Sequence, residues 1–341
     1  MTDSSLPGQI STLTTRRNRI GLLSVVMPAF NEAASLAVLL PTIHEALSPQ
    51  ADALELVVVD DGSTDETALV VHAAIAKGVP ARLVRLSRNF GKEAALSAGL
   101  DLADGDVVIC LDSDGQHPLD TVLEMIEQWR AGYEVVYGVQ TDRRHSQSPT
   151  RRGLTRLFYW LMQLGTRVDM PANAGDFRLL DRCVVQALRR LPERARYMKG
   201  LFAWVGFRAV GVPYVPHNRL HGVTHFKFKR LFSLAITAVT AFTHVPLRIV
   251  TALGLLVSLV AVFFGVWVVF DTLVFGNQVS GYATVVVSIV FLAGVQLLCL
   301  GIIGEYLGRV FDEVKQRPLY LTREVTPPLS RPAVQSPAGQ R

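Results

Sequence analysis

Two carboxylates stand one residue apart at the end of an apolar segment. Val107–Leu111 is a run of branched and aliphatic residues that predicts a buried strand, and Asp112 and Asp114 follow it directly. Residues i and i+2 of an extended chain project to the same side, so both carboxylates face one point. Such oxygens suit a hard divalent cation that keeps positions for substrate phosphates. The pair therefore predicts a metal–diphosphate site, although exposed turns also carry such residues.

Polar side chains also follow the first two predicted strands. Leu22–Ala29 runs into Phe30 and Glu32, and Leu54–Val59 is followed by Asp60 and Asp61. In a parallel sheet these strand ends share one edge, where an acidic residue commonly accepts hydrogen bonds from a ribose. Turn and cap chemistry would satisfy each segment alone. Three polar strand ends on one edge favour a nucleotide site.

Two common phosphate-binding motifs are missing from the sequence. No G-x-G-x-x-G follows the first strand, which argues against a dinucleotide oxidoreductase, and Gly91-Lys92 lacks the rest of a P-loop. Arg88–Glu93 does open a predicted helix, whose first N–H groups attract phosphate. Ordinary helix initiation explains this segment equally well.

Strand and helix signals alternate through the first part of the chain. Strands are expected at 22–29, 54–59, 82–86, 107–111 and 134–139, and helices at 31–47, 91–103 and 118–129. Asn31 is expected to cap the first helix, and Pro41 to break or kink it. This order predicts an α/β fold with a doubly wound, mainly parallel sheet and helices on both faces.

The last third of the chain is strongly apolar. Residues 246–270 and 283–307 would each form a helix about 37 Å long, enough to cross a hydrocarbon core. The link 271–282 has no Lys or Arg while the flanks are basic, so both termini are expected in the cytoplasm. Residues 226–243 carry bases at one end and predict a helix in the membrane interface.

Charge and cysteine content exclude other classes. Basic residues flank the two apolar segments, so the net charge of +5 favours anionic lipid and argues against nucleic acid. Cys110, Cys183 and Cys299 are scattered, which suits reduced thiols better than disulfides or a zinc site. No signal-peptide core is present, so the first domain is expected in the cytoplasm.

Seven segments occur in an order that carries a family resemblance. They are VMPAFNE at 26–32, VDDGSTD at 59–65, RNFGKE at 88–93, DSDGQHP at 112–118, GDFRLLDR at 175–182, GEYLGR at 304–309 and RPLY at 317–320. Together with two spans, they resemble the polyprenyl-phosphate glycosyltransferases. These are inverting family 2 enzymes of GT-A fold, such as bactoprenol glucosyltransferases and relatives of dolichyl-phosphate mannose synthase. The resemblance covers residues 22 to 320.

The resemblance implies an activity and a set of site residues. A single sugar would pass from a nucleoside-diphosphate sugar, with UDP-sugars such as UDP-glucose favoured, to a polyprenyl phosphate such as undecaprenyl phosphate, for the cell envelope. The implied residues are Asp114 and Asp176 for catalysis, Asp112, Asp114 and Gln116 for Mg²⁺ or Mn²⁺, Pro28, Phe30, Glu32, Asp60, Asp61, Lys92 and Asp112 for the nucleotide-sugar, and Arg143, Arg151 and Arg152 for the acceptor phosphate.

The resemblance also implies an arrangement in the cytoplasmic (inner) membrane. Expected parts are a disordered tail at 1–20, a catalytic domain at 21–225, an interfacial helix at 226–245, two transmembrane helices within 246–308 joined by the external link 271–282, and a cytoplasmic segment and tail at 309–341, disordered after Thr322. The chain is expected to contact membrane lipids and to form a homo-oligomer, specifically a tetramer. Small residues four apart, such as Gly254 and Ser258, permit close helix packing.

The chain departs from the family pattern at two positions, and two alternative functions stay open. Relatives usually place an Arg where this chain has Gln140, which would shift acceptor contacts to Arg143 or Arg144, and His225 interrupts a Gly-x-Ser/Thr-Lys-Tyr segment. A processive polysaccharide synthase would need a Q-x-x-R-W motif and more spans. A catalytically silent scaffold would bind the nucleotide-sugar without turnover. Glucose, mannose, N-acetylhexosamine and aminoarabinose donors all fit these shared motifs.

Overall fold

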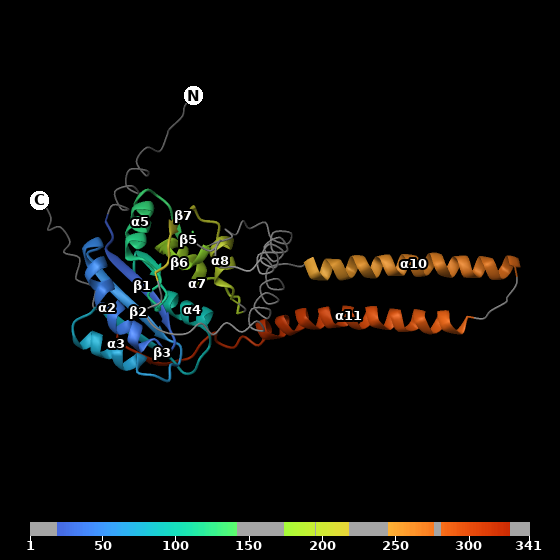
Figure 1. The fold of residues 1–341 in the computed structure, drawn as a ribbon, viewed down its shortest axis with the longest axis horizontal. Helices are drawn as coiled ribbons and strands as arrows, with labels where there is room; N and C mark the ends of the chain where they lie inside the picture. The colour runs from blue at the N-terminus through green and yellow to red at the C-terminus, as the bar shows by residue number, and fades with distance from the viewer. Residues whose placement is uncertain (1–18, 142–173, 195, 218–244, 276–280, 328–341) are drawn as a thin grey trace, which may run out of the picture. The chain divides into compact units, whose positions relative to one another are not determined.

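The computed structural model describes residues 19–141, 174–194, 196–217, 245–275 and 281–327 of the 341. These residues fall into two compact units (Figure 1). The sheet unit lies within 1–152, 168–226 and 318–341, and the helical unit lies within 153–167 and 227–317. Residues 1–18 of the predicted tail at 1–20, residues 226–244 of the predicted interfacial helix at 226–245, and residues 328–341 lie outside the described residues.

The sheet unit is built on one eight-stranded sheet in the order β7-β5-β6-β4-β1-β2-β3-β8. Its strands are β1 (Leu22–Ala29), β2 (Ala53–Asp60), β3 (Ala81–Leu86), β4 (Val107–Cys110), β5 (Val135–Gln140), β6 (Ala174–Asp181), β7 (Ala209–Tyr214) and β8 (Thr322–Val325). Strand β6 is antiparallel to β4 and β5, and β8 is antiparallel to β3; the other pairs are parallel. The predicted α/β class with a mainly parallel sheet is confirmed.

Helices cover both faces of this sheet. They are α2 (Ala33–Leu47), followed by the short η1 (Ser48–Gln50), α3 (Thr67–Ala76), α4 (Lys92–Leu102), α5 (Leu119–Arg130), α7 (Arg182–Arg189) and α8 (Met198–Trp204). Alternate β1 residues, such as Val25 and Met27, join Leu36 of α2 and Val122 of α5 in one buried cluster. On the other face α4 lies so close that a Cβ added to Gly99 would meet Val26 Cγ1 at 2.2 Å.

Two expectations about the first helix, a cap at Asn31 and a break at Pro41, were wrong. Asn31 does not cap it, because α2 begins at Ala33 and the Asn31 side chain instead accepts a hydrogen bond from Thr64 N at 2.8 Å. Asn31 takes a left-handed φ of 57°, which a short polar side chain tolerates. Pro41 does not break the helix, which continues to Leu47. Pro41 is exposed, so water can reach the backbone carbonyl that lacks its hydrogen bond, while the buried face holds the helix.

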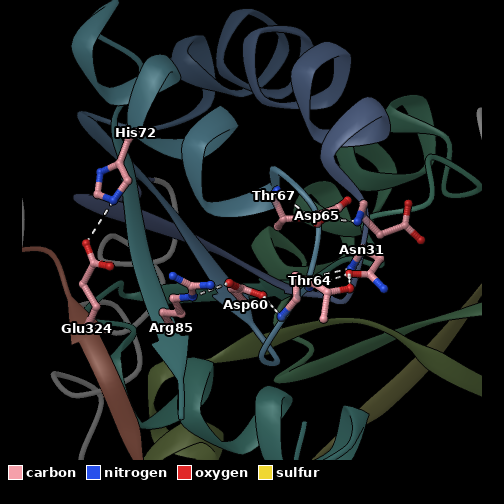
Figure 2. Close-up of polar contacts among 10 residues, drawn as sticks. Asn31, Asp60, Thr64, Asp65, Thr67, His72, Arg85 and Glu324 are labelled. Carbon is pink, nitrogen blue, oxygen red and sulfur yellow. Dashed lines mark hydrogen bonds and ion pairs between the residues drawn. The ribbon is translucent and has the colours of Figure 1, made fainter. Parts of the chain in front are cut away.

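The C-terminal segment contributes a strand that the sequence did not predict. The residues after Thr322 were expected to be disordered, but β8 pairs with β3 along the edge of the sheet. Leu83 N donates to Thr326 Oγ1 at 2.8 Å, and Thr326 N donates to Leu83 O at 2.9 Å. Glu324 also lies 2.9 Å from His72 Nε2 of α3 (Figure 2). The edge of β3 is thereby covered by chain that follows the apolar helices.

Replacing Thr326 with Val is expected to lower the free energy of unfolding by about 1–3 kcal/mol, because Leu83 N–H loses its acceptor. The control Thr322→Val changes an exposed residue of the same strand and should have a much smaller effect. Denaturant unfolding of the full chain in mild detergent measures both. Equal effects of the two variants would contradict a specific role for the Thr326 hydroxyl.

The helical unit contains two long apolar helices, α10 (Val245–Phe275) and α11 (Tyr282–Val314). Within them, Val250–Trp267 and Phe291–Val314 are long and apolar enough to cross a membrane. Their large apolar side chains are mostly exposed, unlike those of a buried core helix. Both helices extend beyond the predicted segments 246–270 and 283–307. The predicted link 271–282 is therefore shorter than expected, since α10 runs on to Phe275.

Candidate functional site

The carboxyl ends of β1, β2 and β4 meet at one edge of the sheet, as the sequence predicted. Asn31 N, just beyond β1, donates to Ser63 Oγ beyond β2 at 2.9 Å. Ser113 Oγ, beyond β4, donates to Pro28 O in β1 at 3.0 Å. Figure 2 shows the β1 and β2 ends side by side, with Asn31 against Thr64. The three polar strand ends therefore form one continuous rim.

Asp60 is fully buried at the end of β2. Its Oδ1 accepts a hydrogen bond from Ser63 N at 2.7 Å, and its Oδ2 lies 3.2 Å from Arg85 Nε in β3 (Figure 2). A buried carboxylate needs such a partner, because burial of an unpaired charge is costly. Asp60 thus holds its own turn and the neighbouring strand; its role toward a nucleoside stays a prediction.

Asp61 connects the end of β2 to the loop before α4. Its two carboxylate oxygens accept hydrogen bonds from Phe90 N at 2.7 Å and Gly91 N at 2.9 Å. Burial raises the pKa of Asp61, although these two hydrogen bonds act in the opposite direction. Gly62, the residue after Asp61, has a φ of 69°. A Cβ added at Gly62 would lie 2.5 Å from the backbone carbon C of Arg88. Only glycine allows this close approach of the two loops.

Lys92, the first residue of α4, joins two of the predicted site carboxylates. Its Nζ lies 2.7 Å from Asp112 Oδ1, beyond β4, and 2.9 Å from Asp176 Oδ2 in β6. Burial opposes the charge of Lys92, but the two carboxylates outweigh it and raise the pKa of the amine. Burial likewise opposes the charge of Asp176, yet Lys92 and Lys199 lower the pKa of that carboxyl. The other oxygen, Asp176 Oδ1, is buried without a hydrogen-bond partner among the described residues.

The donor set at Asp112, Asp114 and Gln116 fits a hard divalent cation in its chemistry. Asp114 is 9% exposed and its Oδ1 accepts a hydrogen bond from Gln116 N at 3.1 Å, which folds the segment into a tight turn. In the part of the chain that the structure describes, no three His, Cys, Asp or Glu side chains converge on one point. A metal ion held by the two carboxylates and the Gln116 amide oxygen, with its remaining positions left for phosphate, stays a prediction.

His117 supports the carboxylate loop, and the sequence analysis assigned it no role. Its Nδ1 accepts a hydrogen bond from Asp112 N at 3.2 Å. Its ring stacks on Phe177 at 4.3 Å with an interplanar angle of 8°, and meets Tyr214 edge-on. Burial lowers the pKa of His117, so the imidazole is neutral and can accept this bond. The sequence signal for His117 was its position in the DSDGQHP segment. Its contact with Phe177 could not be predicted, because that contact depends on where strand β6 lies.

Arg178 places a second cation beside Asp176, and this one is buried. Its Nε donates to Gly175 O at 3.0 Å, and its guanidinium lies 4.6 Å from the centre of the Phe202 ring. Burial lowers the pKa of Arg178 to about 10, so it stays charged at neutral pH. Arg178 lies in the GDFRLLDR segment, but its role could not be predicted because no strand was expected there.

The remaining residues that the sequence pointed to lie at the rim, at the end of β5 or outside the described residues. Phe30 is 45% exposed at the rim, and Glu32 Oε2 accepts a hydrogen bond from Ser35 Oγ at 2.8 Å. Gln140 ends β5. The acceptor residues predicted by resemblance, Arg143, Arg144, Arg151 and Arg152, lie outside the described residues, as does His225. The structure therefore brings together Lys92, Asp112 and Asp176, while their role toward the nucleotide-sugar and the acceptor assignment both stay predictions.

Glu93, next to Lys92, is expected to make the free energy of unfolding depend on pH. Burial and the charge of Asp176 raise the pKa of Glu93 from 4.5 to about 7, although its carboxylate accepts a hydrogen bond from Met198 N. Between these values the unfolded chain loses the proton while the folded chain keeps it. The free energy of unfolding should therefore fall as pH rises from 4.5 to about 7, and then level off.

Glu93→Gln is expected to remove this fall, which amounts to at most about 3 kcal/mol. Glutamine can still accept the bond from Met198 N, so the substitution removes the titration with little other change. The difference in unfolding free energy between wild type and Glu93→Gln, measured in mild detergent across that pH range, isolates the contribution of Glu93. A difference that does not vary with pH would contradict the raised pKa.

Comparison with known proteins gives the family. Residues 24–189 match the Glycosyl transferase family 2 model, and residues 245–310 match the GtrB C-terminal hairpin. An uncharacterized glycosyltransferase of Synechocystis sp. is 41% identical over 303 residues, which is 89% of this chain and 95% of that protein. The SfII prophage-derived bactoprenol glucosyl transferase of Shigella flexneri is 40% identical over 305 residues, covering 89% and 97%.

A solved structure, the mannosyltransferase PcManGT from Pyrobaculum calidifontis, has a TM-score of 0.45 at 20% identity, covering 68% of this chain and 70% of that chain. The sequence relatives have a much higher identity to this chain, and their matches are long enough to include both the sheet unit and the apolar hairpin. The resemblance drawn from the seven segments is thereby confirmed. The chain belongs to glycosyl transferase family 2 and is a glycosyltransferase.

Proposed function

We propose that the protein transfers one sugar from a nucleoside-diphosphate sugar, with a UDP-sugar favoured, to a polyprenyl phosphate at the cytoplasmic face of the membrane. The observation that carries the proposal is the 40% identity to a bactoprenol glucosyl transferase over 97% of that protein. The match includes the apolar hairpin as well as the sheet unit, so it extends to the part of the chain suited to a lipid acceptor. The lipid-linked sugar would serve modification of the cell envelope.

The proposed chemistry is an inverting displacement at the anomeric carbon. An oxygen of the lipid phosphate forms a bond to this carbon while the bond to the nucleoside diphosphate breaks on the opposite face. The lipid phosphate is already anionic, so it needs positioning more than a base. Negative charge develops on the departing diphosphate, and when bound, Mg²⁺ or Mn²⁺ at Asp112, Asp114 and Gln116 supplies positive charge there.

The protein's own residues have distinct proposed tasks in this reaction. Lys92 adds positive charge at the start of α4, a helix N-terminus that favours phosphate. Asp176 Oδ1, which is buried and unpartnered, is oriented to accept a hydrogen bond from a hydroxyl of the donor sugar. Asp60 and Asp61 hold the loops that meet the nucleoside, beside Pro28, Phe30 and Glu32.

The membrane arrangement is part of the proposal. Helices α10 and α11 would cross the membrane twice, with residues 21–225 as a cytoplasmic catalytic domain and both termini in the cytoplasm. A cytoplasmic site would let the phosphate of a long isoprenoid reach the enzyme without leaving the bilayer. Gly254 and Gly304 have no described atom within 4 Å of an added Cβ, which leaves room for a neighbouring helix. We propose a homo-oligomer, specifically a tetramer, and mass measurement in nanodiscs would count its subunits.

The deciding experiment incubates the purified full-length protein with undecaprenyl phosphate and a panel of nucleotide-sugars, with and without Mg²⁺ or Mn²⁺. A metal-dependent product that carries one sugar is expected for one member of the panel. Products with several sugars would favour the processive synthase, and donor binding without turnover would favour the scaffold. Either outcome would overturn the proposal.

The acceptor assignment has its own test. Arg152→Glu is expected to raise the KM for lipid phosphate at least tenfold with little change in the KM for the donor, because Arg grips phosphate with two hydrogen bonds. Steady-state kinetics with each substrate varied separately measures both constants. An equal loss of donor affinity would assign the residue to the nucleotide side or to the fold.

A further inference from the structure

The ion pairs of Lys92 place an ammonium group on a carboxylate that the proposed metal ion also needs. Its Nζ lies 2.7 Å from Asp112 Oδ1 and 2.9 Å from Asp176 Oδ2. A single lysine thus joins the loop beyond β4 to strand β6. Asp112 is the first of the two carboxylates expected to hold the divalent cation, so the lysine and the metal ion compete for it.

We infer, on the basis of the proposed function, that Lys92 occupies the metal site as an internal counter-ion until a nucleoside diphosphate draws it away. A divalent cation that arrived alone would share Asp112 with an ammonium group in direct contact, and the two positive charges would repel. Bare metal ion therefore binds weakly. The lysine keeps the carboxylates neutralised and in place while the donor site is empty.

A nucleoside diphosphate changes this balance because it brings negative charge of its own. Lys92 is 45% exposed in its side chain and starts a helix, so its flexible stem can turn from the carboxylates toward phosphate oxygens. Asp112 is then released to the metal ion, whose remaining positions are filled by the same phosphates. Metal ion and nucleotide should consequently strengthen each other's binding by the same factor.

This coupling predicts opposite effects of one substitution on the two ligands. Lys92→Met should bind Mn²⁺ alone at least tenfold more tightly than the wild type, because Asp112 no longer has a competing cation. The same variant should bind UDP without metal more weakly, because a phosphate partner is lost. A residue that merely stabilised the fold would weaken both, so the opposite signs identify the counter-ion role.

The test measures Mn²⁺ binding to the full-length protein in nanodiscs by electron paramagnetic resonance, with and without UDP. Lys92→Gln serves as a second neutral variant if Lys92→Met does not fold, as judged by thermal unfolding. The control Lys199→Met removes a positive charge that acts on Asp176 from a distance. It should change the affinity for Mn²⁺ alone by less than threefold.

The result that overturns the inference is a folded neutral variant of Lys92 whose affinity for Mn²⁺ alone is unchanged or weaker. An equal gain in the affinity for Mn²⁺ alone in the Lys92 variant and in Lys199→Met would also overturn the inference, because the loss of any nearby positive charge would then explain the effect. These outcomes leave the proposed function standing if the wild type still makes the lipid-linked sugar with metal present. Metal-independent transfer by the wild type would instead reject the metal assignment of the proposed function.

Discussion

Asp114→Asn is expected to lower sugar transfer about a hundred- to a thousandfold, the usual cost of removing one group that stabilises developing charge. Asp114 is nearly buried beside Asp112, and the substitution removes one of the two negative charges that face the proposed metal ion. The fold should survive, because asparagine still offers an oxygen to Gln116 N. The measurement is the rate of transfer at saturating Mg²⁺, with thermal unfolding in the same detergent as a check on the fold.

The matched control for this prediction is Asp120→Asn. Asp120 lies six residues further along the chain, exposed in the first turn of α5, and loses the same charge. It should keep transfer within about twofold of the wild type, since exposed substitutions away from a site have small effects. Full turnover by Asp114→Asn at saturating Mg²⁺ would show that this carboxylate does not hold the metal ion.

Gly62→Ala is expected to lower the free energy of unfolding by about 2–5 kcal/mol and to weaken UDP binding at the same time. The left-handed φ of 69° costs any residue with a Cβ about 1–2 kcal/mol. The added carbon would also lie 2.5 Å from Arg88 C and 2.7 Å from Asn89 N, and overpacking adds about 1–3 kcal/mol. Because both contacts are backbone atoms, the loop that leads to Lys92 must move.

Gly78→Ala separates these two causes. Gly78 has a φ of 87°, but a Cβ added there meets no described atom within 4 Å, so only the backbone strain applies. Denaturant unfolding and UDP titration of both variants give the comparison. If Gly62→Ala were no more harmful than Gly78→Ala, the close approach of the two loops would not matter for stability or for the donor site.

Local patterns in the sequence determined much of the architecture. The apolar runs at Leu22–Ala29 and Val107–Leu111 predicted buried strands, because an apolar run can be recognised from residues that are neighbours in the chain. The length of the apolar segments predicted α10 and α11 in the same way. The rim of the sheet was also predictable, since parallel strands bring their carboxyl ends together and each polar segment follows its strand directly.

Other features were decided only by the tertiary structure. Thr326 bonds to Leu83 across 243 positions of sequence, so the short strand β8 exists through a partner that no local pattern indicates. The segment that contains Lys92 fitted ordinary helix initiation and phosphate binding equally well, and only the packing of α4 on β1 and β2 brings Lys92 to Asp112 and Asp176. Residue types and their spacing limit which chemistry is possible. Which charges neutralise one another depends on distances that packing sets, because electrostatic attraction acts through space and not along the chain.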